Sequence, residues 1–188
     1  MTLSDAHQRF KDRLAELPAL YPSGSPWVFL CAAALVEYLA KLVDGSDTGG
    51  LGYKNFVRNW LALIRPAYAT FSYRSGQSDL PEQMYHVLRC GVVHNLSLIP
   101  APAARAKGGR DRSIVLCHRP EAQQGHLFHL SNYATAEIAD AAIFVAEDFV
   151  DDIDHVVERV FSAAVPGSTL EINMNRWLNE YPLLRGGY

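Results

Sequence analysis

Apolar residues recur every three to four positions along most of this chain, which is the spacing of amphipathic α-helices. The pattern predicts helices over residues 5–17, 26–43, 53–64, 79–98, 136–163 and 169–179. The helix over 26–43 is apolar around most of its circumference, so we expect it to be the central and most buried one. The fold class that follows is all-α, a helical bundle of about five to six helices.

One segment departs from the helical pattern. Residues 99–112 are rich in Pro, Ala, Gly and Arg, and they are too irregular for a helix. Beyond them, residues 113–118 and 126–130 are short β-like runs joined by a turn, which predicts a small β-hairpin. We therefore expect a single domain over residues 1–188, with a basic loop and hairpin insertion at about 99–130.

The predicted helix over residues 79–98 combines a clear start with an unusual set of polar residues. Asp79 is suited to cap its N-terminus and Pro81 to occupy its first turn. Its apolar stripe consists of Met84, Leu88, Val92 and Leu96. The stripe is accompanied by His86, Arg89, Cys90 and His94.

Arg89 and His94 give this helix its candidate chemistry. The two residues are separated by about 140° around a helix, so they flank one face, and a second helix could complete a groove there. Gly91 lies between them, and a glycine in a helix interior costs about 1 kcal/mol relative to alanine. We infer from it the close approach of another backbone.

The order Arg, four residues, His late in an amphipathic helix resembles the signature of the HEPN superfamily, small helical domains of prokaryotic defence and toxin–antitoxin systems. The resemblance implies a HEPN-like bundle that dimerises, bringing two copies of the motif together as a metal-independent endoribonuclease site. Only Arg89 and His94 carry over from the family motif to this chain. Two positions depart from it: Cys90 stands where Asn, Asp or His often follows the Arg, and Leu96 stands where some members have Tyr.

Cleavage of RNA without a metal requires proton transfers and stabilisation of a charged phosphorane. Histidine suits the proton transfers because its ordinary pKa is near ambient pH, and arginine suits the phosphate because it stays charged. We therefore expect His94 to be the general base or acid and Arg89 to stabilise the transition state, with His86 and Cys90 as auxiliary residues. The alternative is that Arg89 makes a structural ion pair, with Glu37 or the acidic helix, and that His94 caps helix carbonyls.

Charged residues are distributed unevenly along the chain, although its net charge is only -3. The acidic run consists of Glu137, Asp140, Glu147, Asp148, Asp151, Asp152, Asp154 and Glu158. A basic run precedes it and contains Arg105, Lys107, Arg110 and Arg112. A local basic segment can bind a polyanion even on an acidic protein, so we expect these four residues to bind RNA. The alternative is that each run is a solvated face.

Several other classes of protein are disfavoured. The 3 cysteines are widely scattered and are interpreted as free thiols of a reducing compartment. No apolar run approaches the ~18 residues of a membrane span, so we expect a cytoplasmic protein with no membrane partner. Residues 44–52 are glycine-rich but lack the Lys-Ser/Thr of a phosphate loop. The histidines between 118 and 129 lack metal-ligand spacing, so we expect neither a metal nor a cofactor.

Two functions from different classes remain. The first is a dimeric HEPN-like endoribonuclease whose partners are RNA, a second copy of the chain and a possible cognate antitoxin or other protein. The second is a catalytically inactive HEPN-like module that binds RNA, a nucleotide or a partner protein. Cys90 is the residue that separates them, because a polar side chain there would have favoured activity.

Overall fold

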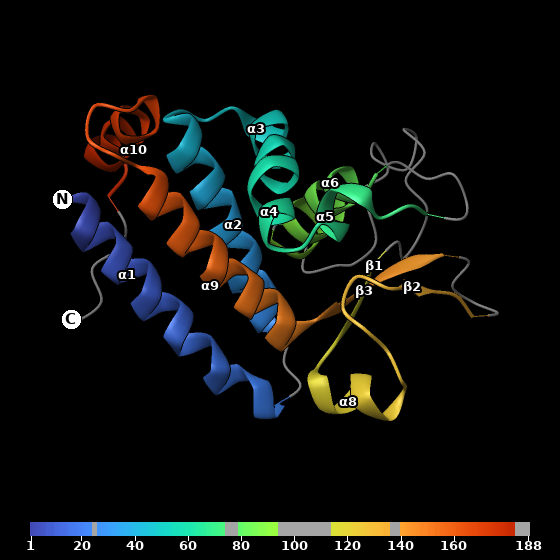
Figure 1. Ribbon diagram of the computed structural model, residues 1–188. Coiled ribbons are helices and arrows are strands. Elements are labelled where there is room, and N and C mark those ends of the chain that lie inside the picture. Colours follow the sequence, from blue (N-terminus) through green and yellow to red (C-terminus); the bar gives the residue numbers. More distant parts are fainter. Residues whose placement is uncertain (24–25, 74–78, 94–113, 136–139, 183–188) are drawn as a thin grey trace.

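The computed structural model describes residues 1–23, 26–73, 79–93, 114–135 and 140–182, and Figure 1 shows how their elements are arranged. These residues are mostly helical and include a small three-stranded sheet. The prediction of a largely helical fold is therefore confirmed. The sheet differs from the predicted hairpin in both its strands and its topology.

The helices before residue 94 are α1 (Leu3–Glu16), the 3-10 helix η1 (Leu17–Ser23), α2 (Trp27–Asp44), α3 (Gly49–Phe56), the π-helical η2 (Val57–Leu61), α4 (Ala62–Ile64), α5 (Ala67–Thr70), α6 (Leu80–Gln83) and the π-helical η3 (Met84–Val93). The elements after residue 113 are β1 (Ile114–Cys117), α8 (Arg119–Gln124), β2 (Asn132–Tyr133), β3 (Ala141–Val145), α9 (Ala146–Ala163) and α10 (Thr169–Glu180). The predicted helix over 53–64 is present as the continuous run of α3, η2 and α4.

Polar side chains fix the starts of several helices. Asp79 accepts a hydrogen bond from the backbone N–H of Glu82, as expected, and this bond caps the helix formed by α6 and η3. Ser168 caps α10 in the same way by accepting from the backbone N–H of Glu171. The first helix begins earlier than predicted because Thr2 and Asp5 form a reciprocal capping box.

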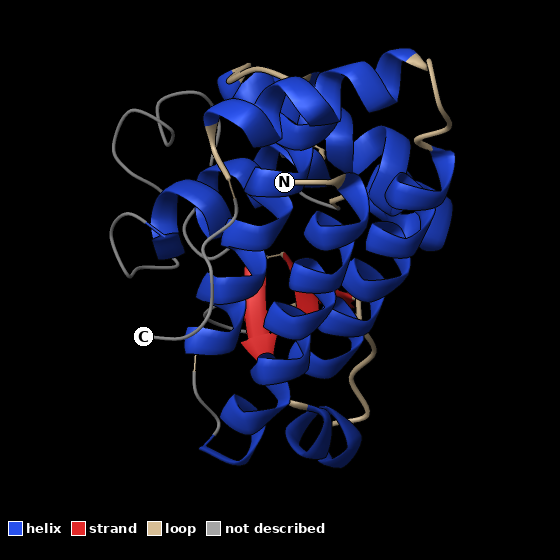
Figure 2. Cartoon of the chain, turned by 90° about the vertical axis from the view of Figure 1, so that its left-hand side faces the viewer, coloured by secondary structure: helices blue, strands red, loops and turns tan. Residues whose placement is uncertain are grey.

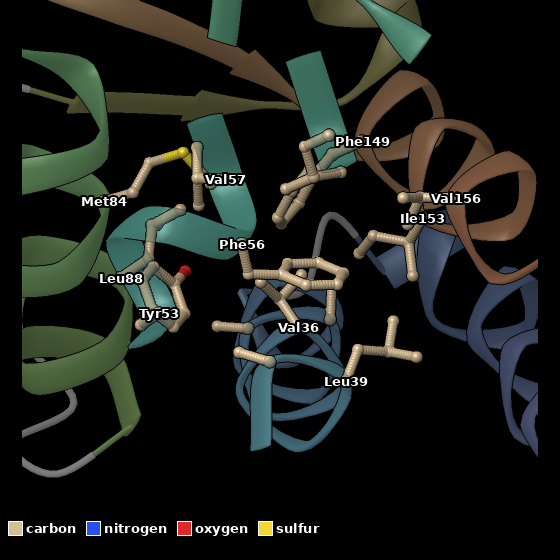
Figure 3. Close-up of a cluster of buried hydrophobic side chains, with 14 of the residues drawn as sticks. Val36, Leu39, Tyr53, Phe56, Val57, Met84, Leu88, Phe149, Ile153 and Val156 are labelled. Atoms are coloured by element: carbon tan, nitrogen blue, oxygen red, sulfur yellow. The ribbon is translucent and has the colours of Figure 1, made fainter. Parts of the chain in front are cut away.

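Helix α2 is the centre of the bundle, as its nearly uniform apolar character predicted. It packs against α3, η3, α9, α10 and η1 (Figure 1). Its buried residues are Val28, Phe29, Ala32, Ala33, Val36, Leu39, Ala40 and Leu42. The small alanines allow neighbouring helices to approach closely. Figure 3 shows side chains of α2, α3, η2, η3 and α9 meeting in one apolar cluster.

The predicted hairpin between 113–118 and 126–130 is wrong. β1 pairs in parallel with β3, with Cys117 opposite Val145, and β2 pairs antiparallel with β3 on its other side. Residues 119–124 form α8, and residue 130 joins the sheet only through one backbone bond from Leu130 to Ile143. Figure 2 shows the strands set among the helices.

The predicted helix over 136–163 is confirmed for Ala146–Ala163 and is wrong for Ala141–Val145, which forms the central strand of the sheet. Residues 136–139 lie outside the described residues. All five residues of this strand are buried. A short, wholly apolar run fits a buried helix turn or a strand covered on both faces, and spacing alone does not distinguish them. Within the described ranges, none of the helices has both the length and the apolar character that a membrane span requires.

Candidate functional site

The helix formed by α6 and η3 positions the residues that the sequence singled out. Its cap at Asp79 and the proline at position 81 set where it begins, and η3 then carries His86, Arg89 and Cys90. η3 has π-helical hydrogen bonding. This bonding is rare, occurs mostly as single turns inside α-helices, and is frequent at functional sites. His94 follows the last described residue of η3 and lies outside the described residues.

The Arg89 guanidinium makes one strong ion pair and two weaker contacts. Its Nη2 donates to Oε1 of Glu37 on α2 at 2.8 Å. Its Nη1 lies 3.7 Å from Sγ of Cys90, and the group sits 5.5 Å from the centre of the Tyr85 ring. The hydrogen bond to Glu37 outweighs burial and raises the pKa of Arg89. Glu37 is one of the two partners expected on the alternative that Arg89 makes a structural ion pair.

Glu37 is shared between two cations. Lys41, one turn further along α2, places its Nζ 3.0 Å from the same Oε1 atom and 3.1 Å from Oδ2 of Asp47. Burial alone would raise the pKa of Glu37, but the hydrogen bonds from Arg89 and Lys41 outweigh it and hold the pKa below its ordinary value. The carboxylate therefore stays charged and holds Arg89 against α2.

Tyr85, which lies beside the Arg89 guanidinium, contacts several other side chains of α3 and η3. Nζ of Lys54 is 5.9 Å from the centre of its ring, the Tyr53 ring is 5.8 Å away, and the His86 ring is 5.2 Å away. The absence of a side chain at Gly50 allows α3 to approach, since a Cβ there would lie 2.7 Å from Cζ of Tyr85. Tyr85 thus links α3 to η3 and supports the Arg89 guanidinium from one side.

His86 belongs to a second group of hydrogen-bonded polar side chains, which also includes Glu82 and Lys54. Its Nε2 lies 2.8 Å from Oε1 of Glu82, and Nζ of Lys54 lies 2.7 Å from the other oxygen of that carboxylate. Burial would raise the pKa of Glu82, but these two hydrogen bonds outweigh it and lower the pKa. His86 is therefore held in place by Glu82, and within the described structure no hydrogen bond or ion pair joins it to Arg89.

The described residues around Arg89 and Tyr85 carry no excess of positive charge. The cations Arg89, Lys41 and Lys54 are matched by the carboxylates of Glu37, Asp47 and Glu82. A phosphate group would therefore compete with a carboxylate for Arg89. The predicted RNA-binding residues Arg105, Lys107, Arg110 and Arg112 lie outside the described residues, as His94 does.

A second polar cluster, which the sequence did not reveal, joins α9 to α5 and to the segment before β2. Asp152 is 3% exposed and receives two hydrogen bonds from Arg65, at 2.8 and 3.0 Å, and one from the Tyr68 hydroxyl at 3.0 Å. Nδ1 of His129 accepts from the backbone N–H of Val145 at 3.0 Å, so the ring proton of the neutral form is on Nε2, facing Tyr68 at 3.2 Å. Each member has a partner, which is typical of a structural network.

Most of the acidic run is paired within the molecule. Arg119 binds Asp148 at 2.6 Å and Asp151 at 3.3 Å, and Lys11 of α1 binds Asp154 at 2.6 Å and Glu158 at 3.0 Å. The run therefore fastens α1 and α8 to α9 and is more than a solvated face. Within the part of the chain that the structure describes, no three His, Cys, Asp or Glu side chains are grouped to hold a metal ion.

Comparisons with known proteins give no relative: no family model, no curated protein sequence and no solved structure matches this chain. The function of this protein therefore has to be inferred from its own residues.

Proposed function

We propose that this protein is a HEPN-like, metal-independent endoribonuclease that acts as a homodimer on RNA, in a defence or toxin–antitoxin setting. The observation that carries the proposal is the placement of Arg89. Its side chain is 22% exposed, and Glu37 and Tyr85 hold it on the helix whose next residues lead to His94. The resemblance to the family signature and the largely helical fold support this assignment.

The chemistry assigns one role to each residue of the motif. His94 removes the proton of the 2′-hydroxyl or protonates the leaving 5′-oxygen, and Arg89 stabilises the charge on the phosphorane. A guanidinium has five N–H donors, and the contacts to Glu37 and Cys90 engage two of its nitrogens. A second chain supplies the same pair across a twofold axis, which provides both an acid and a base in one cleft.

A catalytically inactive RNA-binding or partner-binding module is the second candidate. The observation that favours it is the balance of charge around Arg89, because Glu37 occupies the guanidinium that a phosphate would need. Cys90 also stands beside Arg89, where the family often has a polar residue. On this alternative the basic residues 105–112 would still bind RNA.

Cleavage of RNA in EDTA separates the two candidates. Wild-type protein should cut a mixed set of single-stranded and structured RNAs, and Arg89→Ala and His94→Ala should each reduce the rate at least about 100-fold. Arg89→Ala should remain folded, because Lys41 still pairs with Glu37. The matched control is Arg13→Ala, which removes an exposed pair with Glu16 on α1 and should cut at the wild-type rate.

The outcomes are distinct. Binding of RNA without cleavage by the wild-type protein would favour the inactive module. Cleavage that survives in both motif variants would show that the active residues lie elsewhere.

A further inference from the structure

Two cations contact the same oxygen atom of Glu37. Nη2 of Arg89 lies 2.8 Å from Oε1 of Glu37, and Nζ of Lys41 lies 3.0 Å from it. The Glu37 side chain is only 18% exposed, so water screens its charge weakly. A carboxylate in such surroundings is strongly destabilised when it loses the cations that it contacts. Any phosphate group that draws Arg89 away from Glu37 therefore leaves Glu37 dependent on Lys41.

Lys41 is held beside Glu37 from two sides. It follows Glu37 by one turn on the same helix, α2, and its Nζ also lies 3.1 Å from Oδ2 of Asp47. The other oxygen of Asp47 accepts a hydrogen bond from the backbone N–H of Gly49 at 3.1 Å, which fixes this carboxylate at the start of α3. Burial alone would lower the pKa of Lys41, but the hydrogen bonds with Glu37 and Asp47 outweigh it and raise the pKa. Lys41 therefore stays charged and in place.

The contacts of Arg89 differ from those of Lys41. Cys90 and Tyr85, which contact the guanidinium, lie on η3 as Arg89 itself does. Among the residues that the structure describes, Glu37 is the one hydrogen-bonding or ion-pairing partner that Arg89 has on another element. A guanidinium that turns toward a phosphate group therefore gives up a single ion pair between elements. Of the two cations on Glu37, Arg89 is the one that can change its partner, and Lys41 is the one that is held.

We propose that Lys41 is a positioning residue of this site: when Arg89 exchanges Glu37 for a phosphate group, Lys41 remains on Glu37 and neutralises it. Without Lys41, the Glu37 carboxylate would hold Arg89 more tightly and would repel the incoming phosphate. This role rests on the proposed function only in taking a phosphate group as the ligand of Arg89. It requires no cleavage, so it applies equally to a nuclease and to an inactive module. Lys41 touches Glu37 throughout and does not touch the phosphate.

Titration calorimetry of the full chain with inorganic phosphate, and with a 2′-deoxy oligonucleotide that cannot be cleaved, tests this role. Lys41→Gln removes the charge and should weaken binding of both probes about tenfold, a usual size of coupling within one network of ion pairs. The variant should fold, because Arg89 still pairs with Glu37 in it. Lys41→Met keeps the apolar stem of the side chain and should show the same loss of affinity.

Lys11→Gln is the matched control. Lys11 of α1 also contacts two carboxylates, those of Asp154 at 2.6 Å and Glu158 at 3.0 Å, but both lie on α9. The substitution removes the same charge from the molecule and should leave the affinity for both probes unchanged. An equal loss of affinity in Lys11→Gln and Lys41→Gln would show an effect of net charge alone and would overturn the proposed role of Lys41.

A double-mutant cycle with Glu37→Gln gives a readout that a purely structural role would not change. Without the carboxylate there is no charge for Lys41 to neutralise, so in the Glu37→Gln background Lys41→Gln should no longer weaken binding. A loss of affinity by the same factor in both backgrounds would show that Lys41 contacts the phosphate directly, and would overturn the inference. Equal binding by wild type and Lys41→Gln would also overturn it, as would a wild type that binds neither probe.

The proposed function can fail separately from this inference. Probe binding that depends on Lys41 through Glu37, in a protein that cuts no RNA, would support the exchange of partners and refute the nuclease. RNA cleavage that is identical in wild type and Lys41→Gln, in both kcat and KM, would support the nuclease and refute the exchange.

Discussion

The surroundings of Asp152 determine whether its carboxylate stays charged. Asp152 lies on α9 and is only 3% exposed, so an unpaired charge there would be strongly destabilising. Burial alone would raise its pKa, but hydrogen bonds with His129 and Arg65 outweigh that effect and lower it. Truncating one member of such a network leaves the others buried without a partner.

His129 should make stability depend on pH. Burial lowers its pKa from the ordinary 6.5 and outweighs the attraction of Asp152. As pH falls through about 6.5, the unfolded chain therefore takes up a proton before the folded one does. The free energy of unfolding should be highest above pH 6.5 and should decrease below it, toward the pKa of the folded state.

Urea unfolding of wild type and His129→Asn between pH 7.5 and 5 measures this dependence. Asparagine can still accept from the N–H of Val145 but does not titrate, so the decrease attributable to this residue should disappear. His155→Asn, on the exposed face of α9, is the control and should keep it. An unchanged pH profile in His129→Asn would show that another group is responsible.

Residues with local signals could be assigned from the sequence, and residues with distant partners could not. Asp79 could be assigned as a cap because a helical pattern follows it, and this assignment is confirmed. The pair between Arg89 and Glu37 was named only as one alternative, since it joins residues 52 positions apart. Asp152 could not be distinguished from the acidic residues around it, because its burial depends on how α9 packs.

At the scale of elements, the contact between α3 and η3 depends on one missing side chain. A Cβ at Gly50 would lie 2.7 Å from Cζ and 2.8 Å from Cε1 of Tyr85, well inside normal contact. Either the Tyr85 ring or α3 would have to move. The contact therefore couples the position of α3 to the surface that holds Arg89.

Gly50→Ala should destabilise the protein by about 1–3 kcal/mol through this overpacking. The loss should appear even though alanine favours a helix over glycine by about 1 kcal/mol. Denaturant unfolding gives the difference. Gly125→Ala is the control, because its Cβ would meet the flexible Leu127 side chain at 3.2 Å, and its effect should be smaller. A Gly50→Ala protein as stable as the wild type would mean that the two helices have more room than the structure shows.

The element that the sequence could not assign was β3. Its five apolar residues continue without a break into α9, so the pattern extended the helix over them. β1 lies within the β-like run predicted over 113–118, but the sequence does not show that its partner is β3, and β2 was not predicted. Pairing between distant segments is a tertiary property, and hydrophobic spacing does not record it.

At the scale of the whole molecule, the proposed site requires two chains. Light scattering should therefore give twice the mass of one chain. We expect the helix face around Gly91 to lie at or near the contact between the two chains. Arg89→Ala should retain this mass while losing cleavage, because it removes a functional group and keeps the fold. A monomer whose mass does not change with concentration would count strongly against a site composed from two chains.

The burial of α2 has a consequence for synthesis on the ribosome. Two of its covering helices, α9 and α10, lie more than a hundred residues downstream, so the nascent chain carries the parts of α2 that they cover exposed for most of its elongation. β1 must likewise wait for β3 before its parallel pairing can form. Such late, non-local closure slows folding and leaves apolar surface open to aggregation. The chain should therefore depend on chaperones until its last helices have emerged.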